Sequence, residues 1–186
     1  MNPLDIIHKH YDPDSKASHF LIHHSRLVAK KALAIAERLR DLTPDLRFIE
    51  EAAMLHDIGI LYTNAPRLGC YGYQQYLCHG YLGRELLERE GLPAHALVCE
   101  RHVGVGITAE DIRSNGLPLP ERDMVPLSIE EKIICFADKF YSKSDHDLMH
   151  EKPLAKVREL VAEHGEEKSK IFDAWAKMFG EQDRHL

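Results

Sequence analysis

The 186-residue sequence predicts a single all-α domain, a helical bundle followed by a helical C-terminal extension. In almost every periodic segment, apolar residues recur at spacings of three and four, as in amphipathic helices. No segment alternates apolar and polar residues over the length of a strand. Segments rich in Gly and Pro separate the periodic stretches and mark the turns between them.

Start and stop signals give the order of the expected helices. Thr43-Pro44 is a start signal, with Thr as N-cap and Pro at the first helical position. Ser128 followed by Glu131 forms a capping box. The expected helices span about residues 15–40, 45–56, 76–90, 93–102, 108–113 and 128–142. The tail from Pro153 onward predicts one or two more helices, broken near His164 and ending near Gly180.

Composition excludes several classes of function. The net charge is -6 and both signs are spread along the chain, without a basic stripe, so we expect no nucleic-acid polymer as partner. No apolar run has the length of a membrane span, and the N-terminus lacks a signal-peptide pattern. We therefore expect a cytoplasmic protein without a membrane partner. The cysteines lack metal-binding spacing and are expected to be free thiols: Cys70, Cys78, Cys99 and Cys135.

Several of the 13 histidines occupy the apolar faces of the expected helices. His24 lies four residues before Val28, and Asp138 lies four residues after Ile134. Burial of an isolated charge is costly unless the charge is paired or bound to metal. One such residue would be an ordinary core side chain, whereas five helices that each contribute one predict a shared metal site. Its expected members are His24, His56, Asp57, His79, His102 and Asp138.

The pair His56-Asp57 is expected at a helix end, where both side chains can reach one ion. A carboxylate has two oxygens, so Asp57 could bridge two metals. Imidazole nitrogens suit Fe, Mn, Co, Ni or Zn better than Ca, so the expected cofactor is one or two divalent transition-metal ions. His23 could take the place of His24 as the ligand on its helix.

The local sequences are HSRLVA at His24, MLHDIG at His56 and ICFADKF at Asp138. This H…HD…D order resembles the HD superfamily of metal-dependent phosphohydrolases, and HDIG is the spelling of one of its subfamilies. The similarity is closest to small stand-alone members and covers about residues 20–142. The helical C-terminal extension, at about residues 150–182, lies outside it. The chain departs from the cyclic-dinucleotide phosphodiesterase branch, because Ile60 replaces its Lys and the GYP signature is absent.

The resemblance implies an all-α HD fold and a role for each ligand. His24, His56, Asp57 and Asp138 would hold a first metal, and Asp57 would bridge. The resemblance to two-metal members extends to HGYLGRELL and ERHVGVGIT, whose histidines, His79 and His102, would hold the second metal.

Phosphoryl chemistry also needs cations near the ligands. Arg26 and Lys139 are expected to act in catalysis and substrate binding beside the catalytic Asp57, and Arg101 is a further substrate-binding residue.

The implied activity is cleavage of a phosphoester or phosphoanhydride of a small molecule, by a hydroxide that the metal activates. A nucleotide is the expected substrate. Two alternatives stay open, a di-iron oxygenase with the same ligands and a non-catalytic metal-binding sensor.

Several further residues carry weaker expectations. Tyr71 and Tyr73 could wall a substrate pocket or merely cover the core, and the loop at 114–127, with Arg122 and Asp123, could form an opposite wall. The apolar residues of the tail could pack on the core or form a homodimer face. The remaining histidines are expected at the surface: His8, His10, His19, His146, His150, His164 and His185.

Overall fold

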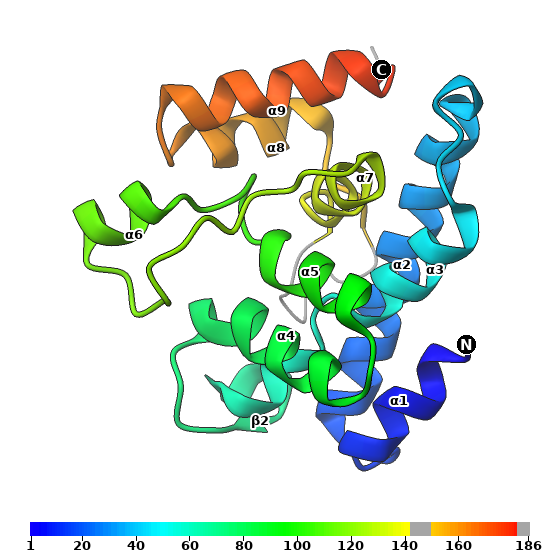
Figure 1. Cartoon of the computed structure of the whole chain (residues 1–186), viewed down its shortest axis with the longest axis vertical. Coiled ribbons are helices and arrows are strands. Elements are labelled where there is room, and N and C mark those ends of the chain that lie inside the picture. Colours follow the sequence, from blue (N-terminus) through cyan, green and yellow to red (C-terminus); the bar gives the residue numbers. More distant parts are fainter. Residues whose placement is uncertain (142–149, 182–186) are drawn as a thin grey trace.

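The computed structural model describes residues 1–141 and 150–181, and in these ranges the protein is built from α-helices (Figure 1). The all-α prediction is confirmed. The helices are α1 (Pro3–His10), α2 (Lys16–Arg38), α3 (Leu46–Leu55), α4 (His79–Arg89), α5 (Pro93–Arg101), α6 (Ala109–Asn115), α7 (Ile129–Asp138), α8 (Leu154–Ala162) and α9 (Glu166–Met178).

Short elements fill the segment between α3 and α4, which the sequence predicts as a loop. A 3₁₀ turn over Ile58–Tyr62 directly follows the His56-Asp57 pair. Strands β1 (Asn64–Ala65) and β2 (Cys70–Tyr71) then form a two-residue antiparallel ladder. The remaining 3₁₀ turns are Arg40–Leu42, Pro66–Leu68 and Tyr76–Cys78.

The start of α3 differs from the sequence prediction. Thr43 adopts a left-handed conformation, with φ 48°, and closes the turn after α2. Asp45 is the N-cap instead, and its side chain accepts a hydrogen bond from the Phe48 amide at 2.9 Å. The prediction of Thr43 as N-cap is wrong because a residue with positive φ cannot have the extended backbone of an N-cap. Helix α1 was not predicted, although Asn2-Pro3 provides the cap that starts it.

Helix α7 is shorter than predicted, since it ends at Asp138 and not near Ser142. Its start is only half of the expected capping box. Ser128 accepts a hydrogen bond from the Glu131 amide, but the Glu131 carboxylate binds the Leu127 amide and Arg101 instead of the Ser128 amide. An arginine from α5 therefore competes successfully for this carboxylate.

The core has two apolar clusters, and the ligand-type side chains lie between them. In α2, residues 17–21 belong to the cluster around α1, α4 and α5, whereas residues 28–36 belong to the cluster around α7, α8 and α9. His24 lies between these two stretches of α2. Along the chain, α3 passes from the second cluster into the first just before His56. Polar ligands are thus buried at the junction of two apolar bodies.

The C-terminal extension packs on α7. In Figure 1, α8 and α9 lie together over α7, and the ring of Phe136 stacks on Phe172 with centroids 4.9 Å apart. Lys31 of α2 is buried, lies 3.9 Å from the Phe140 ring centroid and pairs with Glu151 at 2.8 Å. The apolar tail residues thus cover the core. Among the described residues, no helix is both long and apolar enough to cross a membrane.

Candidate metal centre

Six buried side chains converge at the junction of the two apolar clusters, and each residue is at most 5% exposed. Five of the six stand at a helix end, where the chain turns and the side chains can approach one another. His24 is the exception, in the middle of α2. The six are the residues that the sequence predicts: His24, His56, Asp57, His79, His102 and Asp138.

Two imidazoles and two carboxylates form a first ligand group. Nε2 of His24 lies 3.0 Å from Oδ1 of Asp138 and 3.4 Å from Oδ2 of Asp57. Nε2 of His56 lies 3.5 Å from each of the same two oxygens. The four ligand atoms lie within 4.8 Å of one another, close enough to surround one ion. His24, and not His23, contributes the α2 ligand.

A second group shares Asp57 with the first. Nε2 of His79 and Nε2 of His102 each lie 3.2 Å from Oδ1 of Asp57, whereas the first group faces Oδ2. The two oxygens of one carboxylate therefore point to different groups. A carboxylate with this orientation could face a cation in each group.

The histidine tautomers show that both groups suit a metal. In His56, His79 and His102, Nδ1 lies 2.6–2.7 Å from the carbonyl oxygen three residues earlier. A carbonyl only accepts hydrogen bonds, so each Nδ1 carries a proton, and a ring in its neutral form then directs the lone pair of Nε2 toward the other side chains of the cluster. Nε2 of His79 and Nε2 of His102 are only 3.1 Å apart. Two facing lone pairs at this distance repel unless a cation lies near both.

Burial keeps His102 in the neutral form that can bind a metal. Burial lowers the pKa of His102 to about 3, although the neighbouring Asp57 carboxylate opposes the shift, so the ring is neutral at neutral pH.

All four cysteines are free thiols, as predicted, and two of them donate hydrogen bonds to backbone carbonyls of the cluster. Burial raises the pKa of Cys135 to about 12, and its thiol donates to the His102 carbonyl at 3.3 Å. Cys99 donates to the His56 carbonyl at 2.9 Å.

Gly59, the glycine of the HDIG motif, lies where a side chain would not fit. A Cβ at this position would lie 2.1 Å from the His79 carbonyl oxygen and 2.4 Å from the Gly83 amide nitrogen. The turn after Asp57 therefore packs directly on the first turns of α4, which begins with His79. Tyr11 holds the other side of the turn, donating to the Ile58 carbonyl at 2.6 Å and accepting from the Leu61 amide. Sequence reasoning missed both contacts, although the glycine in HDIG was a signal for close packing.

Lys139 is the predicted cation that lies beside the ligands. Its ammonium donates to Oδ2 of Asp138 at 2.7 Å and to the His102 carbonyl at 3.1 Å. Lys139 therefore joins one ligand of the first group to the backbone of a ligand of the second.

The other two predicted cations lie elsewhere. Nη1 of Arg101 is 3.0 Å from both carboxylate oxygens of Glu131, so this side chain ties α5 to α7. Arg26 is exposed and follows His24 by two positions, which is about 200° around the helix. Its side chain therefore starts on the face of α2 opposite the ligands, and its predicted role has no support from the geometry.

The loop at residues 114–127 lines a cavity through Asn115 and Leu117, as expected, whereas the other predicted wall residues do not line it. Tyr71 and Tyr73 are 77% and 101% exposed, so they neither wall a cavity nor cover the core. Arg122 binds Oε1 of Glu100 at 2.6 Å. Glu100 is buried and also binds Arg84, a structural pair of cations around one carboxylate that sequence reasoning missed. Asp123 accepts a hydrogen bond from the Ala109 amide at the start of α6.

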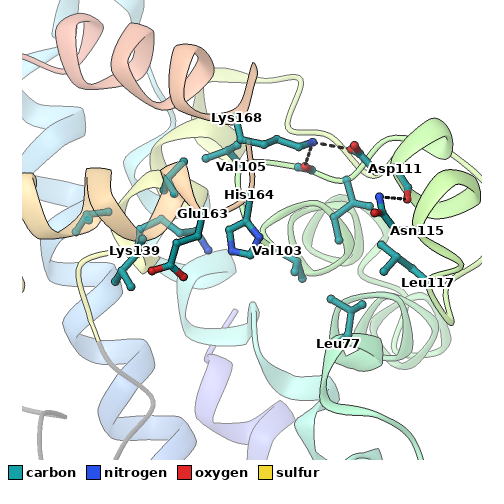
Figure 2. A pocket seen from close by; sticks show the side chains of 16 residues that line it. Leu77, Val103, Val105, Asp111, Asn115, Leu117, Lys139, Glu163, His164 and Lys168 are labelled. Carbon is teal, nitrogen blue, oxygen red and sulfur yellow. Dashed lines mark hydrogen bonds and ion pairs between the residues drawn. The ribbon is translucent and has the colours of Figure 1, made fainter. Parts of the chain in front are cut away.

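A cavity of about 590 Å³ is lined by sequence neighbours of three of the six side chains, although none of the six lines it directly (Figure 2). Its wall includes Leu77, Val103 and Lys139, which lie two, one and one residues from the ligands His79, His102 and Asp138. His164 is exposed, as expected, and it also lines the cavity. His8, His19 and His150 are exposed, whereas His146 and His185 lie outside the described residues.

A family model described as HD domain matches residues 21–142, which include all six side chains of the cluster. The chain belongs to the HD domain family. Membership places it in a superfamily of metal-dependent hydrolases and agrees with the buried histidine and aspartate groups, which could hold a divalent metal ion.

Three curated proteins are similar to this chain in sequence. Two are named tRNA (cytidine(56)-2'-O)-methyltransferase, from Thermoplasma volcanium (32% identical over 75% of this chain and 35% of the relative) and Picrophilus torridus (35% identical over 68% and 33%). The third is an uncharacterised protein of Methanocaldococcus jannaschii, 34% identical over 63% of this chain and 64% of the relative. The chain thus spans about a third of the two methyltransferases. No solved structure matches it.

These relatives correct one prediction. The absence of a basic stripe in the sequence predicts no nucleic-acid polymer as partner, and that prediction is wrong, because two relatives are named for action on tRNA. Net charge is a poor guide when a local site, and not a basic face, contacts the polymer.

Proposed function

We propose that this HD domain is a metal-dependent phosphohydrolase that cleaves a phosphoester or phosphoanhydride bond of a phosphorylated nucleoside. One observation supports the proposal above the others, namely that Asp57 directs its two oxygens to two separate histidine-containing groups. The proposed ligands are His24, His56, Asp57 and Asp138 for a first ion, with Asp57, His79 and His102 for a second. The histidine-rich donor set suits Fe, Mn, Co, Ni or Zn.

Bound divalent metal supplies Lewis acidity and activates water for attack on phosphorus. The protein supplies order and dryness around this chemistry. Backbone carbonyls lock the rings of His56, His79 and His102, so each Nε2 is oriented before any ligand arrives. Burial of all six side chains excludes bulk water and strengthens the electrostatic interactions within the site.

Lys139 is the proposed substrate cation. An ammonium has three N–H donors, and two of them serve Asp138 and the His102 carbonyl. The same side chain lines the cavity, so the third donor can turn toward an anionic group that enters there. Lys139 would thereby stabilise negative charge on a phosphoryl group beside the ligands.

The names of the relatives add RNA as a possible carrier of the phosphorylated nucleoside. The matched region is about a third of each tRNA methyltransferase, so those names do not assign methyl transfer to this part of the chain. We propose hydrolysis at a phosphorylated nucleoside, either free or at the end of an RNA chain.

The test is phosphate release by the full chain, stripped of metal and reloaded with Mn, Fe(II), Co, Ni or Zn. The panel holds nucleoside mono- and polyphosphates, dinucleoside polyphosphates and short RNAs with a 5′- or 3′-terminal phosphate. We expect release on at least one substrate with at least one metal. The variant His56→Ala should abolish it, and His8→Ala, an exposed histidine in α1, should not.

Inertness of every metal-loaded form on the whole panel would contradict the proposal. Oxygen consumption by the Fe(II)-loaded protein with a phosphonate or polyol would favour the di-iron oxygenase instead. A protein that binds metal but shows neither activity would favour the sensor.

A further inference from the structure

The cavity beside the ligands is built from two parts of the chain. One part lies within the match to the HD family, and includes the loop after His102 and Lys139. The other part comes from α8, α9 and the turn between them, beyond residue 142, where the family match ends. Helices outside the family match therefore complete a pocket whose other wall includes Lys139, the side chain that contacts Asp138.

The extension side of the pocket is apolar with polar groups at its edge. Val157, Leu160 and Val161 of α8 provide the aliphatic surface. His164 and Glu163 reach the cavity from the end of α8, and Figure 2 shows Leu77 and Leu117 on the opposite side. The carboxylate of Glu163 would repel a second anion on the extension side, so this part suits an uncharged organic group.

The ligand side of the pocket carries the opposite preference. Lys139 lines the cavity while its ammonium contacts Asp138, a proposed metal ligand, at 2.7 Å. An anion bound here would lie beside the metal centre, and the rest of the molecule would extend toward α8. A volume of about 590 Å³ falls within the range of small-molecule pockets.

Two contacts of Lys168 hold the extension against the rest of the pocket wall. The Lys168 ammonium of α9 donates to the Gly106 carbonyl at 2.8 Å and to Oδ2 of Asp111 at 2.6 Å, as drawn in Figure 2. Asp111 also completes the capping box that starts α6. These two contacts of Lys168 therefore join α9 to the loop after His102 and to α6, which are three of the segments that line the cavity.

We propose that the C-terminal extension forms the substrate-selecting wall of the active site, where α8 and His164 receive the nucleoside half of a substrate whose phosphoryl group meets Lys139. Aliphatic side chains can sandwich the faces of a base, and the imidazole of His164 can donate to or accept from its polar edge. The inference rests on the proposed phosphohydrolase function and names the residues that would choose the substrate.

The test measures binding, so it does not depend on turnover. Equilibrium dialysis of the metal-free full chain would use labelled AMP, GMP, CMP and UMP, with parallel arms of short RNAs that end in a phosphate. Leu160→Trp fills the cavity from α8 and should weaken binding at least tenfold. Ala155→Trp adds the same ring at an exposed position of α8 outside the cavity wall and should bind as the unmodified chain does.

His164→Ala is the second variant, because an exposed side chain can be shortened without harm to the fold. It should weaken binding several-fold and change the preference among the four bases. Circular dichroism would verify that each variant is folded. Tighter binding of the RNAs than of the free nucleotides would identify an RNA end as the source of the nucleoside.

The outcomes separate the two proposals. The pocket proposal is overturned if no nucleotide or RNA binds, or if both pocket variants bind every probe as tightly as the unmodified chain. If the binding series behaves as expected but no metal-loaded form hydrolyses a phosphoester, the hydrolase proposal fails and the pocket stands. If hydrolysis occurs while Leu160→Trp and His164→Ala leave binding and KM unchanged, only the pocket proposal fails.

Discussion

The two ligand groups differ in how the chain holds them. The first draws its four side chains from α2, the end of α3 and the end of α7, which are separated by long stretches of sequence. The second has three side chains, and its two histidines belong to the adjacent helices α4 and α5. The first group is therefore anchored in the bundle itself. The second depends on how closely one helical pair packs against the turn after Asp57.

This difference predicts unequal sensitivity to substitution. Asp57 belongs to both groups, so its loss should affect both, whereas a change in α4 should reach only the second. Substitutions of Asp57 and of the residues that pack the turn after it therefore test whether the two groups differ in this way.

The largest effect is expected for Asp57→Ala, which removes the side chain that both groups share. Both ions should be lost, and hydrolysis should fall on the order of 10⁴-fold or more, as when a catalytic group is deleted. Elemental analysis and phosphate release would measure this. Asp14→Ala, at an exposed position before α2, is the control. Retention of either ion would show that Asp57 does not bridge.

A smaller effect is expected for His79→Ala, which removes a ligand of the second group only. One ion should remain in the first group, and activity should fall by about 10–100-fold. His24→Ala should instead remove the ion of the first group. Metal content of the two variants, measured side by side, distinguishes the groups; equal loss of both ions in each variant would contradict their independence.

Gly59→Ala tests the packing that holds the second group. The new Cβ would meet the His79 carbonyl and the Gly83 backbone, so α4 must move away from Asp57. We expect destabilisation of about 1–3 kcal/mol, typical of overpacking, and weaker binding of the second ion. Denaturant unfolding and metal titration would measure both. Glu85→Ala, on the exposed side of α4, is the control, and a first ion lost as readily as the second would refute the explanation.

The smallest effect is expected for Tyr11→Phe. It removes the hydroxyl that bonds the Ile58 carbonyl and the Leu61 amide behind the turn. Unpairing these buried groups should cost about 1–3 kcal/mol of folding free energy, while both ions stay bound. Chemical denaturation with Tyr73→Phe as the exposed control would test this. A change in metal content would mean that the hydroxyl also positions Asp57.

Sequence reasoning succeeded where a local pattern encodes the structure. Helical periodicity predicted α2, α5, α8 and α9 closely, and ligand-type residues on apolar faces predicted the six members of the cluster. It failed where a distant partner decides. The Glu131 carboxylate binds Arg101 and the Leu127 amide instead of completing the expected capping box. This contact also holds Arg101, a predicted substrate-binding residue, against α7.

The sequence by itself determined the fold class and the members of the histidine and aspartate cluster, because helical periodicity and polar residues on apolar faces can be read from local sequence. Tertiary structure alone decided that the oxygens of Asp57 face different groups, since this depends on the approach of α4 to Gly59. It also decided that Lys139, and not Arg26, lies beside the ligands. The pocket wall from α8 was beyond sequence reasoning for the same reason, because side chains from separate helices define a cavity only once the helices are packed.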